Sequence, residues 1–274
     1  MFARILIGIA DEHDAADAIA LARLLAAPDA EFTLAHVFDS DAHIAPALAQ
    51  VVRRDTALEM LRTVRADAGI EADVVVARDR RPGLGLARLA AERVADLIVI
   101  GASRNVSVWR LLAFGVLGDV LEKLRCALAV APSGFVSPAA LGTIAAGYDG
   151  SPSSVAAVRA ARALAGDRGA ELRVVSVLDP QTGGGSEPAR PDEHAEMHVL
   201  RGEPIDELNR YASTVDLLVI GTRLPGRSHR LRPPSGTCHA LAQHARGPLL
   251  VVPDTAGRPA NPAAVPAAGP TKEV

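Results

Sequence analysis

The sequence has few of the residues that mark a secreted, metal-binding or nucleic-acid-binding protein. Its two cysteines, Cys126 and Cys238, lie far apart in no metal-ligand spacing, which favours two reduced thiols in a cytosolic protein. Aromatic residues make up 3% of the chain, so a base-stacking platform is not expected. The formal net charge of −3 likewise gives no electrostatic reason to expect a nucleic-acid partner.

Long apolar runs are also missing. No stretch reaches the roughly 18 apolar residues that a membrane helix needs. The first residues, MFARILIGIADE, lack the charged start and long apolar run of a signal peptide, and acidic residues begin at Asp11. We therefore expect a cytoplasmic protein with no membrane partner, whose 49% hydrophobic residues build a large buried core.

Four blocks of sequence recur in the same order in the two halves of the chain, which indicates an internal duplication. In VADLIVIGASR and TVDLLVIGTR, for example, the apolar run and the glycine that follows it coincide. The first-copy blocks are residues 4–26, 31–39, 94–104 and 125–132, and their counterparts are residues 142–165, 171–179, 214–223 and 246–253. Chance is a poor explanation for four blocks in one order.

The repeated unit has the pattern of an α/β fold. Runs that are apolar on both faces, such as LIVIG and LLVIG, are typical of parallel strands buried between two helix layers. Residues 14–25 and 153–164 carry apolar side chains at helical spacing, and Ser151 or Ser153 can cap the second helix. We expect two tandem doubly wound units, each a five-stranded parallel sheet with helices on both sides. Their ligand crevices should lie at the carboxyl ends of the strands.

The domains are expected at residues 1–134 and 142–253, and the second should lack one helix. The first copy has a helical pattern over residues 44–68 between its second and third strands. The second copy has only PQTGGGSEPARPDEHAEM there, which is rich in glycine and proline and predicts a flexible loop. Residues 254–274 form a Pro/Ala tail without periodicity, which predicts disorder.

One candidate binding element follows the first strand of the second copy. Asp149 lies at the strand tip and is followed by Gly150 and Ser151. A carboxylate and backbone groups at this place can meet a polar ring edge or a ribose. The alternative is a turn in which Asp and Gly only make the bend.

A second candidate element is the glycine- and arginine-rich loop after the fourth strand of the second copy. Glycines let backbone N–H groups approach an anion, a helix N-terminus adds positive potential, and arginine binds phosphate through two hydrogen bonds. The alternative is a solvated basic loop. The candidate residues in this loop are Gly221, Arg223, Gly226, Arg227, Gly236 and Thr237.

Together these elements resemble the universal stress protein family. Its nucleotide-binding members have a loop of glycine, two residues, glycine, nine residues, glycine, then Ser or Thr. Here Gly226, nine residues and Gly236-Thr237 match the second part, whereas four residues separate Gly221 from Gly226. Counting back from the last strand would instead place the family's last glycine on Ser235. The resemblance covers about residues 3–132 and 142–253.

The resemblance implies a Rossmann-like fold of the adenine nucleotide alpha-hydrolase type and an adenine nucleotide bound in the second copy. Asp149 matches the aspartate that contacts adenine in the family. ATP and AMP fit this reading, cyclic AMP stays open, and Mg²⁺ can accompany ATP. The family also implies that units pair through their last strands, so we expect residues 127–132 and 249–253 to join the copies as an intramolecular pseudo-dimer. A homodimer also stays open.

The first copy departs further from the nucleotide-binding pattern. Ala10 falls where the second copy has Asp149, and Asp11 lies one position late, which on a strand turns a side chain to the other face. In its loop Gly101 is kept, but Arg104 and Phe114 occupy the other glycine positions. We interpret this copy as degenerate and structural.

The leading hypothesis is a stress-response protein that binds an adenine nucleotide and acts by conformation or by contact with a protein partner. The alternatives are a ligand-free tandem scaffold and a weak ATP hydrolase. No catalytic residue is assigned, because phosphoryl transfer needs metal ligands and a water-orienting group that the sequence does not identify. His194 and His198 have the spacing of two metal ligands on a helix, but the glycines and prolines before them favour solvated loop histidines.

Overall fold

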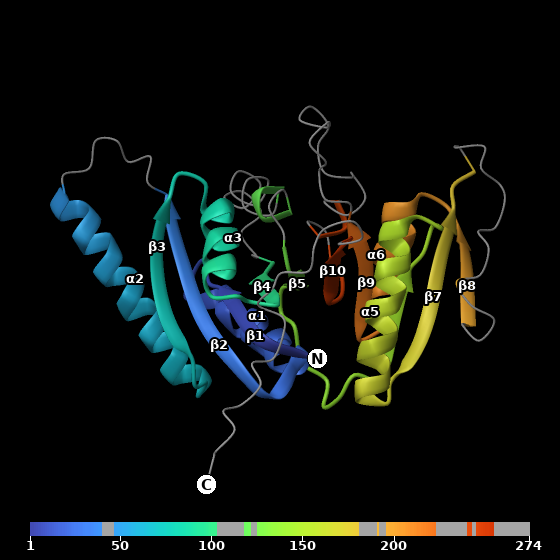
Figure 1. The fold of residues 1–274 in the computed structure, drawn as a ribbon, viewed down its shortest axis with the longest axis horizontal. Helices are drawn as coiled ribbons and strands as arrows, with labels where there is room; N and C mark the ends of the chain where they lie inside the picture. The colour runs from blue at the N-terminus through green and yellow to red at the C-terminus, as the bar shows by residue number, and fades with distance from the viewer. Residues whose placement is uncertain are drawn as a thin grey trace, which may run out of the picture.

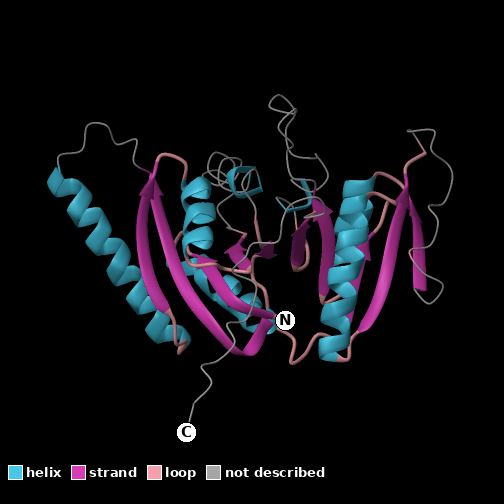
Figure 2. Ribbon diagram, in the orientation of Figure 1, coloured by secondary structure: helices cyan, strands magenta, loops and turns pink. Residues whose placement is uncertain are grey.

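The computed structural model describes residues 1–39, 47–102, 118–121, 125–180, 191, 196–222, 240–242 and 245–254. The first half alternates strands and helices in the order β1(Phe2–Gly8), α1(Glu12–Leu25), β2(Ala26–Asp39), α2(Ala47–Ala68), β3(Asp73–Asp79), α3(Pro82–Glu92), β4(Leu97–Gly101) and β5(Ala127–Ala131). The second half follows as β6(Thr143–Gly147), α5(Pro152–Arg168), β7(Glu171–Leu178), β8(Glu196–Arg201), α6(Pro204–Ala212), β9(Leu217–Thr222) and β10(Leu249–Pro253). The expected α/β alternation in two tandem units is therefore confirmed (Figure 2).

The strands form one continuous ten-stranded sheet in the order β3-β2-β1-β4-β5-β10-β9-β6-β7-β8. Within each half all neighbouring strands are parallel, and the order 3-2-1-4-5 is repeated. The halves meet where β5 and β10 pair antiparallel, with Leu250 opposite Ala129. Figure 1 shows β3 and β8 at opposite edges and this junction in the middle. The expected intramolecular pairing through the last strand of each unit is confirmed.

Hydrophobic packing explains why the central strands are apolar on both faces. Every residue of β4 and β5 is buried. One buried cluster gathers side chains of α1, α2 and α5 on one face of the sheet, and a second gathers those of α3 and α6 on the other. A strand covered on both faces needs apolar residues throughout, which is the origin of the LIVIG and LLVIG patterns.

Polar contacts add to the strand pairing between the halves. The Arg168 guanidinium, at the last residue of α5, donates to the carbonyl oxygens of Leu24 and Ala26 at 2.6 and 3.0 Å. These carbonyls lie at the end of α1, where a helix has acceptors without an internal partner. The N-terminal amino group of Met1 forms an ion pair with Asp167 at 2.9 Å. A helix of the first half is thus capped by an arginine of the second.

Most expected element boundaries agree with the structure. Ser151, rather than Ser153, is the N-cap of α5, and Gly169 ends this helix in the left-handed conformation with φ 64°. Helix α2 is described over Ala47–Ala68, and the first three residues of the expected range 44–68 lie outside the described residues. Between β7 and β8 the structure describes only Asp179, Pro180 and Pro191, so the expected loss of a helix there lies outside the described residues, as does the tail after Asp254. Among the described helices none has the length and apolar character to cross a membrane.

Candidate functional site

A cavity of about 360 Å³ opens at the carboxyl ends of the strands in the second half. It lies at the tip of β6, which has β7 on one side and β9 on the other. The connections that follow β6 and β9 therefore run to opposite sides of this point. Such a switch point leaves a crevice between two diverging loops, and open α/β sheets bind their ligands there. Of the residues predicted from sequence, Asp149, Ser151 and Gly221 line this cavity.

The polar wall of the cavity is built by the turn between β6 and α5. The Oδ1 atom of Asp149 accepts a hydrogen bond from the backbone N–H of Ser151 at 2.9 Å. Gly150 between them has φ 80°, a conformation that favours glycine. The simple-turn reading therefore accounts for Gly150 and for one oxygen of Asp149, while the exposed carboxylate still borders the cavity.

The start of α5 supplies hydroxyl groups that sequence reasoning missed. The Ser151 hydroxyl accepts from the backbone N–H of Ser154 at 3.3 Å and lies 3.0 Å from the Ser153 hydroxyl oxygen. Ser153 and Ser154 are both 6% exposed, and both line the cavity. This helix has 17 residues, and its N-terminus carries positive potential. The wall can therefore donate hydrogen bonds and attract an anion.

Gly221 has a packing role that is independent of any ligand. A Cβ atom built on this residue would lie 1.9 Å from the carbonyl oxygen of Ser153 and 2.3 Å from its carbonyl carbon. Only glycine lets the first turn of α5 approach β9 so closely. The residue thereby sets where the serine hydroxyls lie relative to the strand tips.

The rest of the cavity is apolar. Its apolar lining comes from the ends of β7 and β9, from α6 and from residues 240–242: Val175, Val177, Pro204, Leu208, Ile220 and Leu241. Ligand pockets commonly combine such a surface with a few placed polar groups. In the sequence these positions are visible only as the last apolar residues of strands, a signal that core residues share.

The arginine- and glycine-rich loop is not part of the described structure. Of the residues predicted to bind phosphate, Arg223, Gly226, Arg227, Gly236 and Thr237 lie outside the described residues. The same holds for Arg104 and Phe114 in the first copy. Their role remains a prediction from sequence.

The register of the sheet fixes the equivalent positions of the two halves. The backbone N–H of Ile9 donates to the carbonyl of Ala35 at 2.9 Å, as that of Tyr148 does to Val175 at 2.8 Å. Ala10 therefore follows β1 at the position where Asp149 follows β6. No carboxylate stands there in the first half, and Asp11 comes one residue later.

An ion pair marks the carboxyl edge of the first half. Arg81, the residue before α3, pairs through its guanidinium with the carboxylate of Asp119, which is only 4% exposed. In the second half Glu203 is the residue before α6, and the register of the last two strands of each half places Ala240 at the position of Asp119. The two crevices thus differ in charge as well as in the carboxylate at the strand tip.

The histidine interpretation needs one correction. His198 is not a solvated loop residue: it lies in β8, with its Nδ1 atom 3.3 Å from the Tyr211 hydroxyl and its Nε2 atom 3.2 Å from Glu196. The glycine- and proline-rich run before it obscured a six-residue strand. His194 lies outside the described residues, and the described part of the chain contains no cluster of side chains that could hold a metal ion.

Comparison with known proteins gives one family. The model of the universal stress protein family matches residues 1–132 and 141–197. This match ends before β9 and the glycine-rich loop. A search of curated proteins returns no significant match.

Two solved structures share the arrangement over nearly the whole chain. A universal stress protein from Archaeoglobus fulgidus DSM 4304 is 16% identical, with a TM-score of 0.68, covering 91% of this chain and 96% of its own. A putative universal stress protein from Pseudomonas aeruginosa UCBPP-PA14 is 15% identical, with a TM-score of 0.55, covering 92% of this chain and 94% of its own. At these identities the likeness shows the fold.

Proposed function

The chain belongs to the universal stress protein family, and we propose that its second half binds an adenine nucleotide in the cavity beside Asp149. The protein then acts in the cytoplasm during stress, through its conformation or through contact with a protein partner. The observation that carries the proposal is the cavity at the switch point of β6, β7 and β9, with hydroxyl groups and a carboxylate on one wall and apolar side chains on the others.

The shape and chemistry of the cavity suit a nucleoside. Its volume of about 360 Å³ lies within the range of small-molecule sites. The flat base fits between apolar side chains such as Val177 and Leu208, and the carboxylate of Asp149 can accept a hydrogen bond from the adenine amino group or a ribose hydroxyl. The phosphates then lie toward the N-terminus of α5, where Ser153 contributes a hydroxyl.

The glycine-rich loop completes the proposed site. Gly226, Gly236 and Thr237 offer backbone N–H groups and a hydroxyl to the phosphates, and Arg223 and Arg227 supply charge. ATP, AMP and cyclic AMP all present the adenine and phosphate that this arrangement recognises, and Mg²⁺ can accompany ATP. We assign the structural domain to residues 1–134 and the nucleotide domain to residues 142–253, and a tail follows the nucleotide domain from residue 254.

The rival scaffold hypothesis also has an observation in its favour. Gly150 and Gly221 are both explained by local geometry, one by a positive φ angle and one by the approach of α5. A chain could keep both glycines without any ligand. Direct measurement of nucleotide binding therefore distinguishes the nucleotide-binding protein from the ligand-free scaffold.

Mass spectrometry of the small molecules released from the denatured protein identifies a nucleotide that is bound during purification. Titration calorimetry with ATP, AMP and cyclic AMP should then give one site per chain. Asp149→Ala should weaken binding at least about tenfold, since a hydrogen bond to a charged group contributes about 1.5–3 kcal/mol. Asp149→Asn keeps an oxygen for the turn with Ser151 and isolates the effect of charge.

The matched control is Asp11→Ala, which removes the acidic residue at the corresponding turn of the first half and should leave affinity unchanged. Two sites per chain, or equal effects of Asp11→Ala and Asp149→Ala, would contradict the assignment to the second half. Absence of binding in the parent protein would favour the scaffold.

A further inference from the structure

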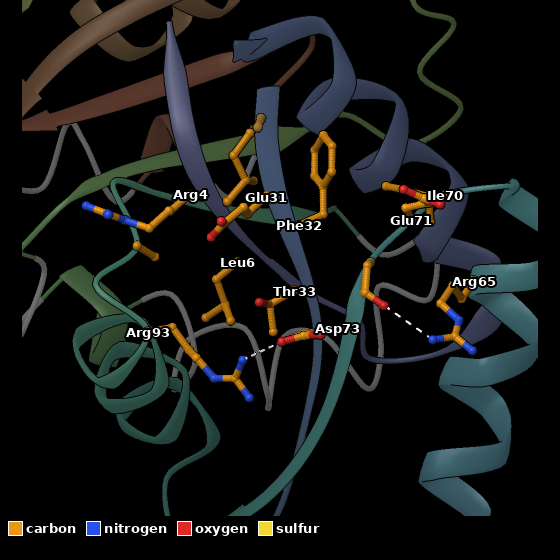
Figure 3. Close-up of a pocket in the computed structure, with 14 residues that line it drawn as sticks. Arg4, Leu6, Glu31, Phe32, Thr33, Arg65, Ile70, Glu71, Asp73 and Arg93 are labelled. Atoms are coloured by element: carbon orange, nitrogen blue, oxygen red, sulfur yellow. Dashed lines mark hydrogen bonds and ion pairs between the residues drawn. The ribbon is translucent and has the colours of Figure 1, made fainter. Parts of the chain in front are cut away.

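The first half contains a second hollow, at the opposite edge of the sheet from the nucleotide cavity. It has a volume of about 790 Å³ and lies where β1, β2 and β3 begin. Figure 3 shows Leu6 and Thr33 on one side of strands β1 and β2, Phe32 directed to the other side, and charged side chains around them. The charged residues that line it are Arg4, Glu31, Arg65, Glu71, Asp73 and Arg93.

The second half shows which side chain fills this place when one is present. Arg4 pairs with Glu31 in the register of β1 and β2, and Thr143 pairs with Glu171 in the register of β6 and β7. Glu31 is therefore equivalent to Glu171, and Thr33 is equivalent to Arg173. In the second half an arginine occupies the position that a small threonine leaves open in the first.

Arg173 is held by its neighbouring carboxylate in a fork geometry. Its Nε and Nη2 atoms donate to the two carboxylate oxygens of Glu171 at 2.8 and 2.9 Å. A planar guanidinium matches a carboxylate in this bidentate way.

The equivalent carboxylate in the first half has no such partner. Within the described part of the chain, the exposed carboxylate of Glu31 takes part in no hydrogen bond or ion pair, whereas the arginines around it bind other groups. Arg93 pairs with Asp73 at 2.7 Å, and the Nε atom of Arg4 donates to the carbonyl of Val94 at 2.8 Å. Figure 3 shows the Arg4 guanidinium directed away from Glu31.

We propose that this hollow binds a small molecule that carries a guanidinium group. Its guanidinium takes the place that Arg173 occupies in the second half and donates two hydrogen bonds to Glu31, while its methylene groups lie over Leu6 and Thr33. Because Arg4 and Arg65 donate only to backbone carbonyl oxygens, they can attract a carboxylate, so a ligand that carries a carboxylate as well as its guanidinium binds more tightly than one with two positive ends. The ligand class is therefore arginine-like.

Titration of the full-length protein with L-arginine, agmatine and L-citrulline tests the proposal. L-arginine should bind more tightly than agmatine, and L-citrulline, in which a neutral urea replaces the guanidinium, should bind at least about tenfold more weakly than L-arginine. Glu31→Gln should weaken L-arginine binding by a similar factor. The matched control is Glu171→Gln, which removes the equivalent carboxylate of the second half and should leave L-arginine binding unchanged.

A second variant, Thr33→Arg, fills the hollow with the side chain found in the second half. It should abolish L-arginine binding and keep a cooperative thermal unfolding transition, because Glu31 can hold the new guanidinium as Glu171 holds Arg173. Equal affinity for L-arginine and L-citrulline, or unchanged binding in Glu31→Gln, would overturn the proposal. The nucleotide site takes no part in these measurements, so its assignment stands or falls separately.

Discussion

Replacing Gly221 by alanine tests how closely α5 approaches the sheet. The new Cβ atom would lie 1.9 Å from the carbonyl oxygen of Ser153, a separation that non-bonded atoms do not adopt. The Ser153 atoms are backbone, and the position of a Cβ atom is fixed by its own backbone, so no side-chain rotation relieves the clash and the first turn of α5 has to move. Overpacking of this kind costs about 1–3 kcal/mol or more. We expect Gly221→Ala to lower the free energy of unfolding by at least that amount.

The same displacement should reach the nucleotide cavity. Ser151, Ser153 and Ser154 lie in the turn that must move, and all three line the cavity. A shift of this turn changes the polar wall without removing any polar atom. Gly221→Ala should therefore weaken nucleotide binding as well as stability.

Gly166→Ala is the matched control for this experiment. Gly166 lies on the exposed side of the same helix, and a Cβ atom there would meet nothing within 4 Å. Alanine at this position should stabilise the protein by about 0.5–1 kcal/mol, because glycine is the weaker helix former. Urea denaturation followed by circular dichroism measures both variants. Equal stabilities of Gly221→Ala and Gly166→Ala would refute the close approach of α5 to β9.

Two further predictions concern other parts of the molecule. Burial, with the nearby charge of Asp96, raises the pKa of the Cys126 thiol to about 12. In a Cys238→Ser variant, alkylation of Cys126 should therefore be very slow at pH 8 and accelerate only as the pH approaches 12. Rapid alkylation of the folded variant at pH 8 would count against this prediction. Arg168→Ala removes two hydrogen bonds to the end of α1 and should destabilise the protein by about 1–3 kcal/mol in urea denaturation, whereas Arg159→Ala, on the exposed side of α5, should change it by less than about 0.5 kcal/mol.

Local patterns were enough to predict the central strands and their burial, whereas the pairing of the two halves was predicted from the resemblance to the family. LIVIG becomes β4 because a strand covered on both faces must be apolar throughout, and this requirement is visible in five residues. Ser151 was a predictable cap because its hydroxyl bonds within its own turn. Asp149 was likewise predictable as a strand-tip residue, because it directly follows a strand and bonds to Ser151 within the same short turn.

The features that were missed depend on distant parts of the chain. Ser153 reaches the cavity because Gly221, 68 positions further along the sequence, admits α5 to the tip of β9. His198 was misassigned because the turn-forming residues before it outweighed a short strand that is defined by pairing with β7. Neither relation is present in a window of sequence around the residue itself.

The hollow in the first half illustrates the same limit in another form. A cavity results from a side chain that is absent, and Thr33 by itself is an ordinary strand residue. Its meaning appears only when the register aligns it with Arg173 and shows Glu31 without the partner that Glu171 has. Duplication thus provides an internal reference. Both copies keep this carboxylate, as Glu31 and Glu171, but only the second copy has the arginine that binds it, so the first copy has a place of defined charge and geometry. A ligand can occupy that place without any change in the backbone, which is how a site can arise in a copy whose carboxyl-end crevice lacks the strand-tip carboxylate.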